Sequence, residues 1–213
     1  MTLPELAHQI VYARLAWGVV LAALLVAVLK RRTSISMLGV GGVLLASIAA
    51  MALPGGASPA FWLVLAFQVP STMLLFCCAL FLWRCASALH PQDFISQPWA
   101  AGLAALGGLL YLDSMGWLTL EVYALGFDPH WAPAAAVALG LAALWALRFQ
   151  VHGHSAIALL GCVALFSLLR LPSGNLLDAL LDPMLWLWAS VHTARAGWRR
   201  VRGARARAGN APA

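Results

Sequence analysis

Charged side chains are scarce in this sequence. The 213 residues include 13 lysines and arginines and seven aspartates and glutamates, so that only 9% are charged while 63% are hydrophobic. A water-soluble domain carries roughly a quarter charged residues, which keep its surface hydrated. The composition therefore excludes an ordinary soluble domain and predicts that most side chains face lipid or other helices.

Cysteine and the common catalytic motifs are also rare or absent. The four cysteines, Cys77, Cys78, Cys85 and Cys162, all lie in apolar runs, where cysteine behaves as a small hydrophobic residue, so we expect neither disulfides nor a metal site. The chain contains no Gly-x-Ser-Gly motif, no His-Glu-x-x-His motif and no phosphate-binding glycine loop. The sequence therefore supplies no standard signature of a serine hydrolase, a zinc protease or a nucleotide-binding enzyme.

Long apolar runs are what the sequence does have. A helix needs about 20 mostly apolar residues to cross a bilayer. Seven runs approach this length, and they cover residues 8–29, 35–53, 60–83, 98–112, 129–147, 155–171 and 183–196. The fourth and seventh are short, so six crossings are an alternative. We predict an all-α, polytopic transmembrane helix bundle of about seven spans, formed as a single domain by residues 1–196.

Capping residues followed by proline precede three of these runs, in Ser58-Pro59, Asp128-Pro129 and Asp182-Pro183. Such pairs are typical of helix starts, because the side-chain oxygen accepts a hydrogen bond from a free backbone N–H and proline needs none. They support these helix boundaries.

Basic residues predict the orientation, because cytoplasmic loops hold an excess of lysine and arginine. The basic residues that follow the first, third, fifth and seventh runs all fall on one side of a seven-span chain. They are Lys30, Arg31, Arg32, Arg84, Arg148 and the arginines after residue 194. We therefore expect the N-terminus outside and the C-terminus in the cytoplasm. Since all basic residues except Lys30 are arginine and alanine is abundant, the composition favours the inner membrane of a bacterium.

The net charge of +6 does not indicate nucleic-acid binding, because six of the basic residues lie in a final segment that lacks the fold of a specific base reader. We interpret residues 197–213 as a basic, disordered cytoplasmic tail. Its arginines would contact anionic lipid headgroups, at about 1 kcal/mol for each residue near the surface.

Acidic residues on the predicted outer side form the first candidate site. Asn175, Asp178 and Asp182 are three and four residues apart, so they would share one helix face. Together with Asp113 and Glu121 they could bind a cation or act as acid and base. The alternative interpretation is that Asn175, Asp178 and Asp182 cap or stabilise helix starts.

Two further candidates lie within or near the spans. His154 and His192 map to the cytoplasmic ends of the sixth and seventh runs and, if these are neighbours, could ligate a haem or a transition metal. Gln68, Pro70, Ser71 and Thr72 lie in the middle of the third run, where a proline-bent helix could line a polar cavity. These polar residues could equally satisfy the backbone groups that the bend frees.

The function that this pattern favours is non-catalytic. Membrane catalysis usually requires ionisable groups within the spans, and here almost every charge maps to a rim. We therefore expect a subunit or assembly partner of a membrane complex, or a small transporter. An enzyme that uses the outer acids is the second hypothesis, and a haem or metal protein that uses His154 and His192 is the third.

Overall fold

Helices form the whole fold of the described residues. The computed structural model describes residues 4–87, 95–118 and 120–209, and within these ranges there is no strand. The helices of 15 residues or more are α1 (Leu6–Leu29), α2 (Met37–Met51), α4 (Thr72–Ala86), α5 (Gln97–Ser114), α7 (Trp131–Arg148), α8 (Gly153–Leu169) and α10 (Pro183–Gly209). Shorter ones are η1 (Gly55–Ala57), α3 (Pro59–Phe67), α6 (Val122–Leu125) and α9 (Leu176–Leu180). The prediction of an all-α chain is confirmed.

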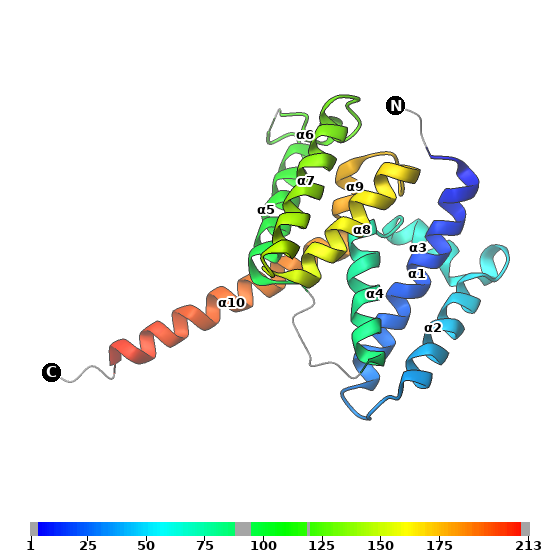
Figure 1. Cartoon of the computed structure of the whole chain (residues 1–213), viewed down its shortest axis with the longest axis horizontal. Helices are drawn as coiled ribbons and strands as arrows, with labels where there is room; N and C mark the ends of the chain where they lie inside the picture. Colours follow the sequence, from blue (N-terminus) through cyan, green and yellow to red (C-terminus); the bar gives the residue numbers. More distant parts are fainter. Residues whose placement is uncertain (1–3, 88–94, 119, 210–213) are drawn as a thin grey trace.

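Each predicted apolar run overlaps one long helix. The third run, residues 60–83, also contains α3, because it is divided in two by residues 68–71. Figure 1 shows that the chain passes along α3 from the end of α2 to the start of α4. The interruption is therefore a full break between two helices rather than a bend in one.

Helix length alone does not account for seven crossings. Within the described part of the chain, two helices, α1 and α7, are long and apolar enough to cross a membrane. The apolar helices α2, α4 and α8 have 15 to 17 residues. At 1.5 Å per residue, a helix of 15 residues is about 22 Å long, against about 30 Å for the hydrocarbon core.

The main contacts between the long helices form a row, from α2 through α1, α4 and α8 to α7, and a separate pair, α5 with α10 (Figure 1). α1 packs against α2 and α4, α4 packs against α8, and α8 packs against α7. α10 packs along α5, and its second half extends away from the bundle. The predicted pairing of the sixth and seventh runs is therefore replaced by two others, α7 with α8 and α5 with α10.

The packing of α7 places small side chains inside and large apolar ones outside. Ala132, Ala136, Ala143 and Ala146 are buried. On the opposite face Val137, Leu141 and Trp145 are exposed to 60% or more of their area. A helix on the surface of a soluble protein has the reverse arrangement, with its large apolar side chains in the core. Small residues at helix contacts are typical of bundles surrounded by lipid.

The helix α10 extends into the C-terminal segment, for which a disordered tail from residue 197 stays a prediction. α10 continues to Gly209, and residues 210–213 lie outside the described part. The physical reason is that alanine and arginine, which dominate this segment, have the highest intrinsic helix propensities.

Candidate functional site

The break between α3 and α4 places the buried polar residues Ser71 and Thr72 in the apolar core. Gln68 ends α3 with a positive φ of 63°, a conformation that side-chain-bearing residues rarely adopt. Pro70 follows, and Ser71 caps α4 by accepting a hydrogen bond from the N–H of Leu74 at 3.1 Å. The break frees several backbone groups that need partners away from water.

Two aromatic residues of α1 supply partners for the freed carbonyls. The hydroxyl of Tyr12 donates to the carbonyl oxygen of Pro70 at 2.9 Å. The indole N–H of Trp17 donates to the carbonyl oxygen of Gln68 at 3.2 Å. The side chains of α1 therefore hold the non-helical backbone in place.

Asp182 supplies a partner for a freed N–H. One carboxylate oxygen accepts a hydrogen bond from the N–H of Ser71 at 2.8 Å. The other accepts one from Leu185 at 2.8 Å and so caps α10. Asp182 thus connects the start of α10 to the start of α4. It acts as the cap that its position before Pro183 predicts, and it makes one further bond to Ser71.

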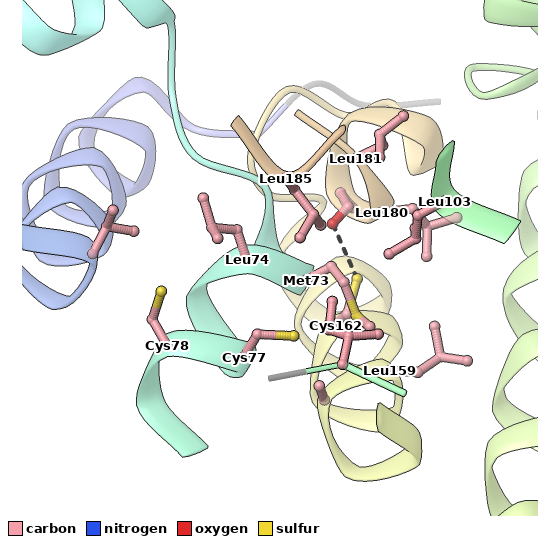
Figure 2. Close-up of a cluster of buried hydrophobic side chains, with 14 of the residues drawn as sticks. Met73, Leu74, Cys77, Cys78, Leu103, Leu159, Cys162, Leu180, Leu181 and Leu185 are labelled. Atoms are coloured by element: carbon pink, nitrogen blue, oxygen red, sulfur yellow. Dashed lines mark hydrogen bonds between the residues drawn. The ribbon is translucent and has the colours of Figure 1, made fainter. Parts of the chain in front are cut away.

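Thr72 connects α4 to the helices behind it. Its buried hydroxyl donates to the carbonyl oxygen of Ala179 in α9 at 2.9 Å and lies 2.9 Å from the sulfur of Cys162 in α8. Cys162 also donates to Ala179, at 3.1 Å. Figure 2 shows Cys162 close to Met73 of α4 and Leu180 of α9. This contact joins three helices through one carbonyl oxygen.

The four residues that could line a polar cavity lie in different surroundings. The side chain of Gln68 is exposed, whereas Ser71 and Thr72 are fully buried and hydrogen-bonded within the protein. The four residues 68 and 70–72 therefore do not face one common space. Their polar groups hold helices together.

Asp178 belongs to a second cluster on the same end of the bundle. It accepts hydrogen bonds from the hydroxyl of Tyr123 at 2.9 Å and from that of Ser173. Asn175, which is completely buried, caps α9 through the N–H of Leu177 at 2.8 Å and donates to the carbonyl oxygen of Tyr123 at 3.1 Å. The cluster fastens the loop that contains α6 to the start of α9.

Asp113 and Glu121 lie at the two ends of the loop before α6, and Asp113 stabilises that loop. Asp113 accepts hydrogen bonds from the N–H groups of Leu120 and Val122, at 3.0 and 2.7 Å. Glu121 is exposed and has a positive φ of 49°. The acids that were grouped as one candidate site thus divide between the helix break, the α6 loop and α9.

Two ionisable groups outside the long helices have altered acidity. Burial, followed by the charge of Asp178, raises the pKa of Tyr123 to about 12. Backbone hydrogen bonds from Trp131 and His130 lower the pKa of Asp128 from its ordinary value. Both shifts favour the protonation state that these residues already have at neutral pH, which suits structural contacts better than proton transfer.

The two candidate haem ligands have different partners. His154, near the start of α8, contacts the guanidinium of Arg84 in α4. The ring of His192 in α10 stacks on Trp188 of the same helix, with ring centroids 4.9 Å apart. Within residues 4–87, 95–118 and 120–209, no three His, Cys, Asp or Glu side chains are grouped so as to hold a metal ion.

The long-range contacts of this region leave no signal in the sequence. Tyr12 and Trp17 resemble other aromatic residues in apolar runs, which ordinarily face lipid or pack against other helices. The local helix caps were visible in the sequence, since a cap and its N–H lie within three residues.

The chain matches no protein-family model, no curated protein and no solved structure.

Proposed function

We propose that the chain is a multi-pass membrane protein with its N-terminus outside and its C-terminus in the cytoplasm, and that it acts without catalysis as a subunit or assembly partner of a membrane complex. One observation carries the membrane assignment, namely the inverted packing of α7. Valine, leucine and tryptophan side chains cover its outer face while alanines fill its contacts. A face of this kind in water would promote aggregation.

The non-catalytic role is supported by the state of the candidate acids. Asp113, Asp178 and Asp182 each accept two hydrogen bonds from within the chain. A general base or a metal ligand needs a lone pair that is directed at its substrate or ion. These carboxylates are directed at backbone N–H groups and hydroxyls of the fold itself.

The end of α10 is the part that suits contact with a partner. It extends beyond the bundle (Figure 1) and carries Trp198 and Val201, which are 60% and 49% exposed, beside Arg195 and Arg199. Exposed tryptophan and arginine are the residues most enriched where proteins bind one another. The same arginines suit the anionic lipid headgroups of the cytoplasmic leaflet.

The orientation is tested with a reporter enzyme that is active on one side only, fused after Ala196 in one variant and before Met1 in another. A reporter that is active only outside should be active in the fusion before Met1 and inactive in the fusion after Ala196. Both termini on the same side would overturn an odd number of crossings.

The partner role is tested by a photo-crosslinking residue in the intact membrane. Placed at Trp198, it should give a discrete protein adduct, whereas at Val137 on the outer face of α7 it should react with lipid alone. Lipid adducts alone at both positions would contradict the subunit role.

A small transporter is the second candidate, and the break between α3 and α4 favours it. Non-helical backbone within a membrane bundle is a recurrent feature of transport sites. Uptake or efflux that depends on the chain, in vesicles that hold no other protein, would establish transport in place of the subunit role.

A further inference from the structure

Arg14 is a charged residue inside the longest apolar helix of the bundle core. It lies in α1 and is partly buried, yet it makes no hydrogen bond, ion pair or ring contact within the described part of the chain. A charge within a membrane span is energetically costly and is ordinarily paired or functional. Among the described residues, Arg14 is thus an ionisable group of α1 that the fold itself does not use.

The side chain of Arg14 lines a groove between α1 and α3 with a volume of about 350 Å³. Most of the wall is apolar and includes Ile10, Phe61, Val64 and Leu65. A volume of this order is typical of small-molecule sites.

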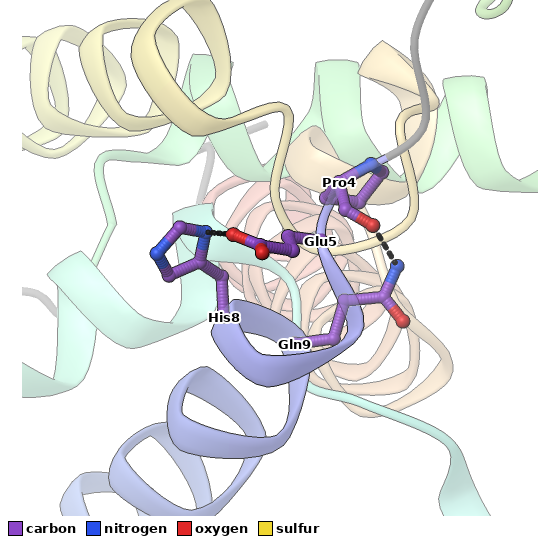
Figure 3. Close-up of polar contacts among 4 residues, drawn as sticks. All are labelled: Pro4, Glu5, His8 and Gln9. Carbon is purple, nitrogen blue, oxygen red and sulfur yellow. Dashed lines mark hydrogen bonds and ion pairs between the residues drawn. The ribbon is translucent and has the colours of Figure 1, made fainter.

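The polar groups of the groove leave the guanidinium without an internal anion. Ser58 is engaged with the carbonyl oxygen of Met51 at 2.8 Å, and Gln9 donates to the carbonyl oxygen of Pro4 at 3.5 Å. Figure 3 shows that the nearby Glu5 is paired with His8, at 3.4 Å. The lining residues include no carboxylate, so the groove is basic and apolar at once.

The position of Arg14 along α1 matches the headgroup layer. It follows Leu6, the first helical residue, by eight positions, or about 12 Å along the axis. Side chains on a helix lean towards its N-terminus, and arginine extends its charge towards the interface while its methylene groups stay in apolar surroundings. The guanidinium can therefore reach the outer phosphate layer while the groove continues into the hydrocarbon layer.

We propose that this groove binds one anionic phospholipid of the outer leaflet, with its phosphate on Arg14 and an acyl chain along α1 and α3. The guanidinium fork suits phosphate oxygens, which it can bind through two parallel hydrogen bonds. A net anionic lipid is selected over a zwitterionic one because no acid lines the groove to receive an ammonium group. The proposal rests on the membrane location proposed above.

The test is native mass spectrometry of the full chain released from nanodiscs that contain equal amounts of phosphatidylglycerol and phosphatidylcholine. The wild-type protein should retain one phosphatidylglycerol, and Arg14→Gln should reduce this retention roughly tenfold, the loss expected for a charge-assisted contact. Arg14→Lys should give an intermediate value because it keeps the charge but not the fork. Arg31→Gln removes an exposed arginine outside the groove and should retain the lipid as the wild type does.

A second variant covers the case in which Arg14→Gln fails to fold. Leu65→Trp adds bulk at an exposed groove residue and should reduce lipid retention while Arg14 stays in place. Equal retention in these variants and the wild type, or equal retention of both lipids, would overturn the proposal. Displacement of the lipid by inorganic phosphate alone would also overturn it, since a soluble anion would then be the ligand.

This result is separable from the membrane assignment. A wild-type chain that does not sediment with membranes refutes the membrane location. A chain that sediments normally but carries no phosphatidylglycerol refutes the lipid site alone.

Discussion

The carboxylate of Asp182 accepts a hydrogen bond from the backbone N–H of Ser71, a residue 111 positions earlier in the chain, at 2.8 Å. The same carboxylate caps α10 through Leu185. Two helices that begin far apart in the sequence are thus joined at their starts. The bond also satisfies a donor that the interruption of the third apolar run would otherwise leave unpaired within the core.

Replacing Asp182 with alanine should destabilise the fold, since it removes two backbone hydrogen bonds to a carboxylate. We expect a loss of about 2 kcal/mol, which corresponds to a fall of roughly 4–8 °C in unfolding temperature for a chain of this size. The measurement is the reaction of a thiol-specific dye on heating in detergent, because all four cysteines are buried in the folded chain.

Asp128→Ala is the matched control for this experiment. It removes a cap of the same chemistry from α7, where the carboxylate serves only its own helix start, at His130 and Trp131. Its effect should be the smaller of the two. An equal effect would mean that the bond to Ser71 contributes nothing.

The neighbouring glycines Gly107 and Gly108 of α5 test the packing of α10. A Cβ atom on Gly107 would lie 2.1 Å from the ring of Trp186, whose indole N–H donates to Ala104 at 3.1 Å, while a Cβ on Gly108 would meet open space. Gly107→Ala should therefore cost about 1–3 kcal/mol. Gly108→Ala should be neutral or stabilising by up to about 1 kcal/mol, because alanine favours the helix.

Both variants are compared by the same thermal assay. If Gly107→Ala unfolds at the wild-type temperature, α5 and α10 do not pack as described.

The helix caps and the apolar runs could be predicted from the sequence, whereas the break between α3 and α4 could not. The caps at Ser58, Asp128 and Asp182 were predictable because each acts on N–H groups within three residues. The apolar runs were predictable for a similar reason, since composition over a window decides helix formation. The break at residues 68–71 appeared in the sequence only as a proline, which is compatible with either a bend or two helices.

The candidate site was less predictable because its contacts cross long stretches of sequence. Thr72 meets Ala179 and Tyr123 meets Asp178 only once the helices are in place, and spacing within one helix carries no information on such pairs. The spacing of Asn175, Asp178 and Asp182 predicts that the three side chains share one face of a continuous helix. The chain instead ends α9 at Leu180 and begins α10 at Pro183, so Asp182 is directed at α4 rather than along α9.

The contact between Tyr123 and Asp178 predicts a stability change at high pH. The pKa of Tyr123 in the folded chain is about 12, above the ordinary value of 10.0, so folding favours the neutral phenol. The stabilisation is fully present below pH 10 and is lost as the pH rises through about 12. Unfolding followed between these pH values should show this loss in the wild type and a smaller one in Tyr123→Phe.

Absorbance of ionised tyrosine supplies an independent measurement. The difference between the wild type and Tyr123→Phe should titrate near pH 12. Titration of this difference at the ordinary value of 10.0 would show that the phenol is neither desolvated nor bound to Asp178.

Thr72→Val separates a structural role for the helix break from a transport role. Valine keeps the shape of threonine but removes the hydroxyl that donates to Ala179, so that this buried carbonyl oxygen keeps only the bond from Cys162. We expect a loss of about 1–2 kcal/mol in the free energy of unfolding, and Thr72→Ser, which retains the hydroxyl, should recover most of it.

If Thr72→Val unfolds at the wild-type temperature but abolishes a transport activity of the chain, the hydroxyl of Thr72 binds a cargo and does not stabilise the fold. A lower unfolding temperature with function retained in proportion to the folded fraction would instead assign Thr72 to holding α4, α8 and α9 together, as the subunit proposal requires.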